Sequence, residues 1–346
     1  MDQRHSRLRP AYLRGGRVRA AGRGAPPQLR PGPCRPDLGT QPVNGPVLAS
    51  IFTGLQVGAT LVASEAVVAE VGAGRLGFLR YAVALLILVP VAVLSSGTPV
   101  SRRDMLPVAL IGIGQFGVLV ALLNVAVLHT GSPRVALVFA TLPIVTLALG
   151  LRFAAGRVSP LELASIVLSV VGVVFLLAGE ALTGRMSASD WIGVGCAVLA
   201  TLTGALCSHL YRPYLQRCGV AKVSVIAMLA SLLPLGVMAL VEGQGLPMAA
   251  WSRQTLVLVG FVGLSSGVGF LLWLYALSRL QAAVVTAFLG LSPVTAVILS
   301  VLFLGTAPTV TLAVAMVLVI GSLAATAFAQ RRGRKMSPLP AGGGGG

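Results

Sequence analysis

Ten mostly apolar stretches follow one another between Val47 and Phe328, separated by short polar turns. As helices rising 1.5 Å per residue, about twenty residues cross a hydrocarbon layer of roughly 30 Å. Lipid offers the backbone no hydrogen-bond partners, so each stretch must satisfy its own peptide groups as a helix. The sequence therefore predicts an all-α membrane protein with ten transmembrane helices. We place them at residues 47–69, 76–95, 105–128, 133–151, 160–178, 190–211, 223–241, 254–277, 283–304 and 309–328.

The composition agrees with a membrane protein that has no large soluble domain. Hydrophobic residues make up 56 % of the chain and charged residues 10 %, against about 25 % charged in soluble domains. No GxxxxGK[ST] loop is present, so ATP binding of that type is excluded. Neither CxxC nor Cys/His spacing occurs among the four cysteines, and we expect no metal site and no cofactor.

The net charge of +17 is concentrated in the tails and in alternate loops. Nine arginines precede residue 46, and no basic helix carries the interleaved aromatic residues of a nucleic-acid-binding surface. Of the other 17 Lys and Arg residues, 12 fall in the C-terminal tail or in loops on the same side as it. By the positive-inside rule, both termini are expected to be cytoplasmic in a multi-pass cell-membrane protein.

The two ends of the chain differ from the apolar region between them. Residues 1–45 are rich in Arg, Pro and Gly and are expected to be disordered. They are either a basic cytoplasmic tail or the result of a start codon assigned too far upstream, in which case translation begins near Val43 or Val47. Residues 330–346 are expected to form a basic, Gly-rich cytoplasmic tail.

The apolar region also repeats itself. A shift of 150 residues aligns Leu142–Val145 with Ser292–Thr295, and Phe153 with Phe303. Each half, residues 46–180 and 188–329, then contains five predicted helices. An odd number of helices per half forces the halves into opposite orientations, which is the inverted repeat of many secondary transporters.

Several local patterns resemble the drug/metabolite transporter superfamily, in particular its ten-helix EamA-type members. Leu76–Pro90 is similar to the family's second helix with its LRY…A…L…P run. Leu271–Val284, continued by Leu291–Val297 and Phe303–Gly305, is similar to its eighth and ninth helices. The resemblance covers about residues 47–328 and implies two five-helix repeats and a transport function.

The sequence departs from the family pattern at three places. Gly156 and Thr306 stand where the family usually has Glu after helices four and nine. A tryptophan common early in the first helix is absent, because this chain has Ile51–Gly54 there. The resemblance therefore implies the fold and a transport function more strongly than it implies any particular substrate.

Ionisable residues inside membrane helices are costly and are functional candidates. Glu65 and Arg80 lie 7 and 8 residues from Gly72 on two successive antiparallel helices, so they are expected at similar depth. They form either an ion pair lining a cavity or a structural pair at the outer rim. Arg134 is either a ligand for a substrate carboxylate or an interfacial anchor.

Candidates for a proton relay are Glu65, His129 and His209, although each histidine lies near a helix end, where a structural role is also expected. Further cavity candidates are polar or amphipathic side chains within the predicted helices: Gln56, Gln115, Asn124, Trp273 and Tyr275. Gln56 and Glu65 are nine residues apart, about 180° around a helix, so both cannot face one cavity, and the same holds for Gln115 and Asn124.

Pro143 and Pro293 occupy equivalent positions in the two halves and are expected to kink their helices, either at a binding site or for packing curvature alone. The GxxxG pairs Gly54/Gly58 and Gly263/Gly267 are expected to allow close helix approach. The latter lies in a GxSxG string, but all three histidines precede it, which argues against an intramembrane serine protease.

These observations favour a non-enzymatic secondary transporter. We expect it to export a small polar metabolite, such as an amino acid or a toxic analogue, by alternating access, with a proton as the candidate coupling ion. The alternative is a non-transporting membrane scaffold or an accessory component of lipid or envelope processes.

Overall fold

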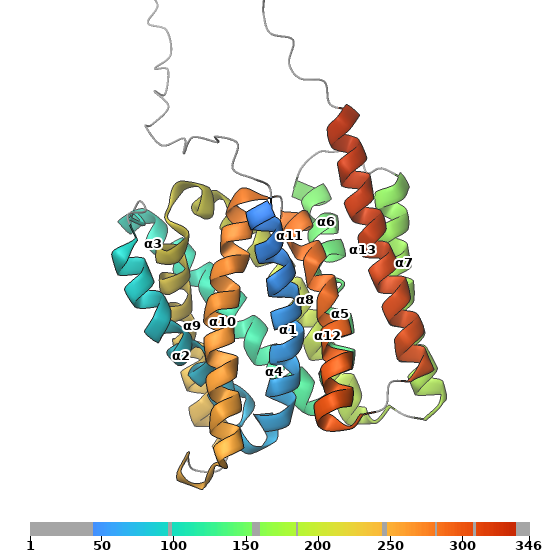
Figure 1. Ribbon diagram of the computed structural model, residues 1–346, viewed down its shortest axis with the longest axis horizontal. Coiled ribbons are helices and arrows are strands. Elements are labelled where there is room, and N and C mark those ends of the chain that lie inside the picture. Colours follow the sequence, from blue (N-terminus) through green and yellow to red (C-terminus); the bar gives the residue numbers. More distant parts are fainter. Residues whose placement is uncertain are drawn as a thin grey trace, which may run out of the picture. The chain divides into compact units, whose positions relative to one another are not determined.

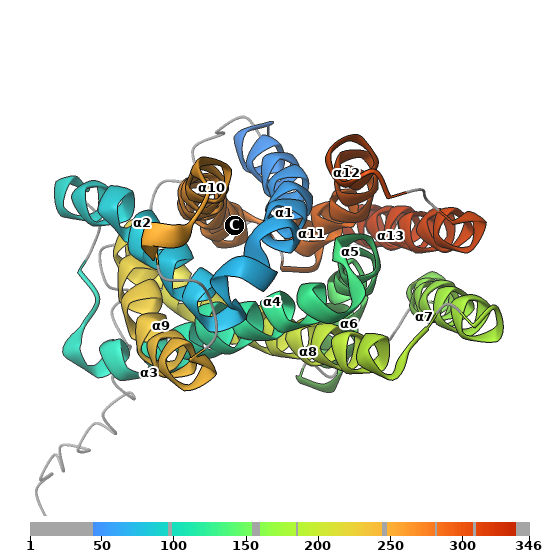
Figure 2. The same cartoon turned by 90° about the horizontal axis from the view of Figure 1, so that it is seen from below.

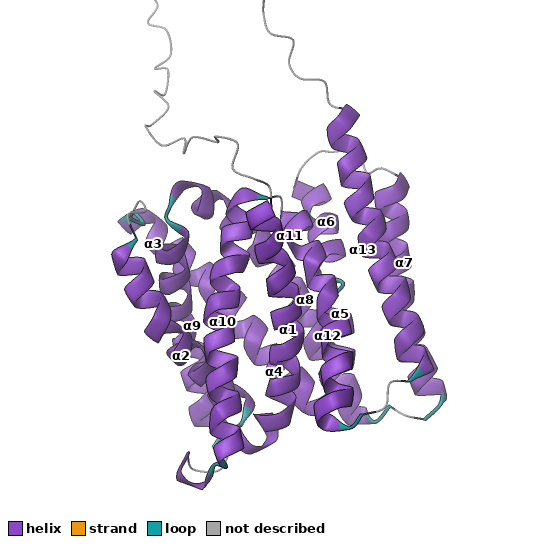
Figure 3. Cartoon of the chain, viewed as in Figure 1, coloured by secondary structure: helices purple, strands orange, loops and turns teal. Residues whose placement is uncertain are grey.

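The computed structural model describes residues 44–95, 99–153, 160–184, 186–243, 248–280, 282–306 and 309–336. Residues 1–43 of the segment predicted to be disordered lie outside the described residues, as does the Gly-rich end after Met336, whereas Asn44 and Gly45 belong to the first helix. The described residues are helical, and no strand is assigned within them (Figure 3).

Thirteen α-helices are assigned in this part of the chain (Figure 1). The first half contains α1 (Asn44–Val71), α2 (Ala73–Leu94), α3 (Arg102–Gly112), α4 (Leu119–Thr130), α5 (Ser132–Phe139), α6 (Leu142–Phe153) and α7 (Pro160–Leu182). The second half contains α8 (Ala188–Arg217), α9 (Val220–Glu242), α10 (Arg253–Arg279), α11 (Ala282–Ala287), α12 (Ser292–Leu299) and α13 (Val310–Met336). A π-helical turn, Ile113–Val118, joins α3 to α4, and a second one, Ser300–Leu304, follows α12. Short 3-10 helices are Met248–Ala250 and Phe288–Leu291.

Eight helical segments are long and apolar enough to cross a membrane. They are Gly45–Val71, Ala73–Leu94, Arg102–Thr130, Ser132–Gly150, Ala188–Leu215, Val220–Glu242, Arg253–Arg279 and Val284–Leu304. The fifth and tenth predicted spans correspond to α7 and α13, whose apolar parts, Val167–Leu182 and Val310–Ser322, are shorter. The protein is thus an all-α membrane protein with at least eight candidate spans. The helix α13 also continues through Arg331–Lys335, which were expected to lie in a tail.

The bundle brings together helices from both halves of the chain. Helix α1 packs on α10, α2 packs on α9 and α10, and α4 packs on α8, while α7 and α13 pair at one edge (Figure 2). The end of α1 and the start of α10 meet where Thr255 donates a hydrogen bond to Glu70. The start of α8 lies at that same end of the bundle, so α1 and α8, which begin the two halves, run in opposite directions (Figure 1).

Two predicted helices are interrupted beside their prolines. The helix predicted at 133–151 is divided at Ala140–Thr141, and Pro143 lies in the first turn of α6. In the second half a 3-10 turn separates α11 from α12, and Pro293 lies in the first turn of α12. Proline has no N–H to donate, and the first turn of a helix is where that loss costs least.

Glycines of α1 hold it close to the interrupted helix of the second half. A Cβ at Gly58 would lie 2.4 Å from the Ser292 carbonyl oxygen, and one at Gly54 would lie 2.1 Å from that of Phe288. Any larger residue would therefore force α1 and α12 apart. Gly263 makes a similarly close approach to Val83, as expected for small residues between membrane helices.

Candidate substrate site

A cavity lies between α1, α2, α4, α10 and the two interrupted helices. Its volume is about 40 Å³, which is room for a few water molecules. Polar side chains that line it are Thr53, Gln56, Thr60, Arg80, Gln115 and Ser266. Its apolar walls are Val57, Leu61, Leu119, Val120, Leu123, Phe139, Leu142, Phe270, Trp273 and Leu289. Four of the predicted cavity residues, Gln56, Arg80, Gln115 and Trp273, are thus brought together.

Arg80 is the charged residue of this lining. Its side chain is 5 % exposed, and one terminal nitrogen donates a hydrogen bond of 2.8 Å to the Ser64 hydroxyl. Ser64 in turn donates to the Thr60 carbonyl oxygen at 2.6 Å, which fixes the hydroxyl with its lone pairs toward the guanidinium. The Nε of Arg80 is buried and has no hydrogen-bond partner among the described residues.

Two glutamines add amide groups to the cavity. Gln56 donates to the Ser265 hydroxyl at 3.3 Å, and its oxygen lies where a side chain at Gly269 would stand. The Oε1 of Gln115 is buried and accepts no hydrogen bond from the residues described. The residues that line the cavity therefore include a charged donor, Arg80, and an acceptor without a partner among the described residues, Gln115.

Aromatic rings close one wall of the cavity. Phe270 lines it and packs edge-on against Phe116, with ring centroids 4.9 Å apart. Tyr81 and Tyr211 lie behind these rings, at 5.7 and 6.2 Å from Phe116. This packing gives the cavity a rigid apolar wall.

The ion pair considered for Glu65 and Arg80 does not form. Glu65 instead accepts a 2.8 Å hydrogen bond from the backbone N–H of Ser132 at the start of α5. The reason is the rotation of α1, which turns Gln56, Thr60 and Ser64 toward Arg80 and Glu65 toward α5. A carboxylate at this helix N-terminus is favoured by the unpaired N–H groups there.

The remaining candidates lie outside the cavity lining. Asn124 donates to the carbonyl oxygen of Ala73 at 2.9 Å, and Tyr275 lies beneath the guanidinium of Arg279. His129 contacts the Ser189 hydroxyl at 2.7 Å, and His209 contacts the Thr146 carbonyl oxygen at 2.6 Å. Neither histidine nor Glu65 reaches the cavity, so a proton relay through them has no support in this arrangement.

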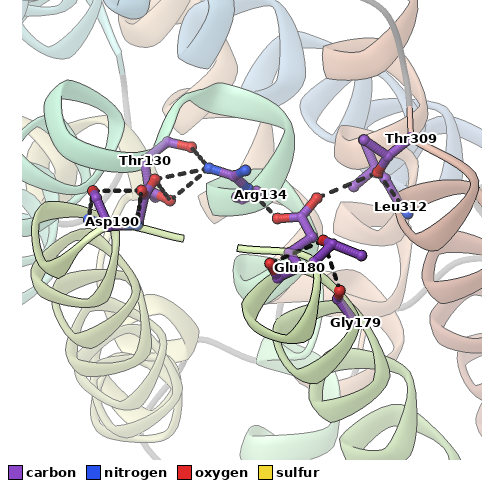
Figure 4. Close-up of polar contacts among 9 residues, drawn as sticks. Thr130, Arg134, Gly179, Glu180, Asp190, Thr309 and Leu312 are labelled. Atoms are coloured by element: carbon purple, nitrogen blue, oxygen red, sulfur yellow. Dashed lines mark hydrogen bonds and ion pairs between the residues drawn. The ribbon is translucent and has the colours of Figure 1, made fainter. Parts of the chain in front are cut away.

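Arg134 also makes its contacts away from the cavity, in a cluster that we call the clasp: Thr130, Arg134, Glu180, Asp190 and Thr309 (Figure 4). Its Nε contacts the Glu180 carboxylate and its terminal nitrogen lies 2.8 Å from Asp190. Thr309 donates to Glu180 at 3.3 Å and Thr130 to Asp190 at 3.1 Å. In this conformation the carboxylates of Glu180 and Asp190 therefore occupy the Arg134 guanidinium.

Sequence reasoning did not identify the partners of the two arginines. Glu180 stands in the apolar run at the end of α7, and an acidic residue at such a position is the signal that the sequence offered. The structure leaves it 2 % exposed. Ser64 shares a helix face with Gln56, so a search for polar residues along that face would have found it.

A family comparison decides the broader identity of the chain. The model of the EamA-like transporter family matches residues 45–178 and again residues 185–328. The chain belongs to the EamA-like transporter family. The resemblance noted from the sequence is confirmed, and the two matched segments are the two repeats. The protein is a membrane transporter by family.

Two relatives are also transporters by name. A "probable terminal-alkyne amino-acid exporter" of Streptantibioticus cattleyicolor is 29 % identical over 60 % of this chain and 67 % of its own length. An "uncharacterized transporter" of Clostridium kluyveri is 22 % identical over 70 % of this chain and 80 % of its own length. A solved crystal structure aligns with a TM-score of 0.63 at 19 % identity, over 84 % of this chain and 98 % of that one, which shows a shared fold.

Proposed function

We propose that this EamA-family protein is a secondary exporter of the cell membrane that carries a small polar metabolite by alternating access. In this proposal the chain crosses the bilayer ten times, with α7 and α13 completing two inverted five-helix repeats and both termini in the cytoplasm. The solute is an amino acid or a related compound. Its transport is driven either by coupling to protons or by exchange for a second solute.

The observation that carries this proposal is a cavity that both repeats line with polar side chains among apolar ones. Arg80 and Gln115 come from the first half, while Ser266 and Trp273 come from the second. Burying such groups costs free energy that a non-transporting scaffold would have no reason to incur. Transport explains them, because a solute passing between two halves needs polar contacts from each.

The breaks in the interrupted helices would allow the cavity to widen. Phe139 and Leu142 flank the break between α5 and α6, and Leu289 lies in the 3-10 turn before α12. A volume of about 40 Å³ does not accommodate an amino acid, so these walls must separate for a solute to enter. Breaks that already lack regular helical hydrogen bonds are suited to such a movement.

The test is solute flux in proteoliposomes that contain the purified full chain. We expect wild-type protein to accelerate the efflux of at least one solute in a panel of amino acids and analogues. Gln115→Leu should lower that flux at least tenfold, whereas Leu233→Ala, at a 71 % exposed position on α9, should not. A panel that wild-type protein fails to move would refute the transport proposal.

A further inference from the structure

The charge of Arg80 is not balanced by the acidic side chains around it. No carboxylate of the described residues lies within ion-pair distance of its guanidinium. Five carboxylates near the helix ends are engaged elsewhere: Glu65 with the Ser132 N–H, Glu70 with Thr255, Glu242 with the Gly74 N–H, and Glu180 and Asp190 with Arg134. The cavity therefore contains one net positive charge.

Such a charge is unfavourable unless something compensates it. An arginine that is 5 % exposed has lost most of its hydration, and the hydrogen bond to Ser64, the one that its side chain makes among the described residues, restores only part of it. The buried Nε remains available as a donor. A guanidinium edge with free donors matches a carboxylate, which accepts two parallel N–H bonds.

The other residues that line the cavity restrict the chemistry of the rest of the solute. Phe270, Leu119, Leu123 and Leu142 present apolar surface, so a charged or long polar side chain would lose its hydration there. Gln115 Oε1 offers an acceptor for one N–H or O–H donor of the solute.

We propose that Arg80 binds the carboxylate of the transported solute, and that this solute is a small monocarboxylate with a compact apolar remainder and one donor group that faces Gln115. This inference rests on the proposed transport function and assigns its substrate class. Ser64 is a positioning residue, because it orients the guanidinium and does not line the cavity itself.

A consequence separates this role from a structural one. If Arg80 served packing, its removal would lower the thermal stability of the ligand-free protein. If it is a substrate ligand held at a cost, Arg80→Met should leave the melting temperature unchanged or raise it, while abolishing stabilisation by solute. Arg80→Lys keeps the charge but loses the two parallel N–H donors of the guanidinium, so solute should still stabilise this variant, but less than the wild type.

Thermal unfolding of the purified full chain in detergent tests this with three matched probes. L-Valine has both a carboxylate and an ammonium, 3-methylbutanoate has only the carboxylate, and 2-methylpropylamine has only the ammonium. We expect valine to raise the melting temperature most, 3-methylbutanoate less and the amine not at all. Arg279→Met, which removes an exposed arginine that does not line the cavity, is the control and should keep the wild-type response.

Stabilisation by the amine alone, or by valine equally in wild type and Arg80→Met, would overturn the inference, as would no stabilisation by either carboxylate probe. Proteoliposome flux separates this result from the transport proposal. A wild-type protein that moves uncharged or cationic solutes, with Arg80→Met still active, would refute the carboxylate role and leave transport standing. Absence of any flux would refute transport itself.

Discussion

The clasp gives a prediction whose size follows from the burial of each member. Replacing Arg134 by Met removes the cation between Glu180 and Asp190 (Figure 4). Asp190 loses little, because Ser187 still donates to it from both its backbone N–H and its hydroxyl, at 2.8 and 2.7 Å. Among the described residues Glu180 keeps the Thr309 hydroxyl as its side-chain partner, so it becomes a buried carboxylate with no counter-charge from that part of the chain.

Removing one partner of a buried ion pair typically costs 3–5 kcal/mol. The Arg134 side chain is 21 % exposed and that of Glu180 is 3 % exposed, so we take the lower end, about 3 kcal/mol. Glu180→Gln leaves Arg134 paired with Asp190 and should cost about 1 kcal/mol. In that background Arg134→Met strands no charge and should cost only about 1 kcal/mol more, which gives a coupling of about 2 kcal/mol.

Thermal unfolding of the four proteins in detergent measures this coupling. At about 2 °C per kcal/mol, Arg134→Met should lower the melting temperature by about 6 °C and Glu180→Gln by about 2 °C. The double variant should lie about 4 °C below wild type, above the single Arg134→Met variant. Additive losses, or equal losses in the two single variants, would show that Arg134 does not stabilise the fold by compensating Glu180.

Three further predictions follow from the same contacts. Gly58→Leu should lower the free energy of unfolding by at least about 2 kcal/mol and reduce solute flux, because α1 and α12 must separate. Gly236→Ala is the control and should change the melting temperature little, because its Cβ would be 3.5 Å from its nearest neighbour. Asn124→Leu should lower stability by about 1 kcal/mol through loss of its bond to Ala73, measured in the same unfolding assay. Exchange of labelled for unlabelled solute by the wild-type protein should exceed net efflux about tenfold, equivalent to about 1.4 kcal/mol, because an empty carrier must move with Arg80 uncompensated. Equal rates of exchange and net efflux would contradict this reasoning.

Much of the fold was predictable because lipid imposes simple rules on a sequence. Long apolar runs identified the helices, and eight of them are long and apolar enough to span the bilayer. The 150-residue repeat placed Pro143 and Pro293 in corresponding helices, both of which are interrupted there. Intramembrane polar residues also singled out Gln56, Arg80 and Gln115, because so few residues of that kind occur in these helices.

The sequence alone determined that this protein lies in a lipid bilayer, where its helices run and which few polar residues they contain. Only the tertiary structure decided which of them meet. The helices are apolar on all sides, so no hydrophobic face fixes their rotation, and close packing at residues such as Gly58 sets it instead. That packing turned Gln56 into the cavity and Glu65 away from it. It also supplied Arg134 with carboxylates 46 and 56 residues along the chain, contacts that depend on how distant helices fold together.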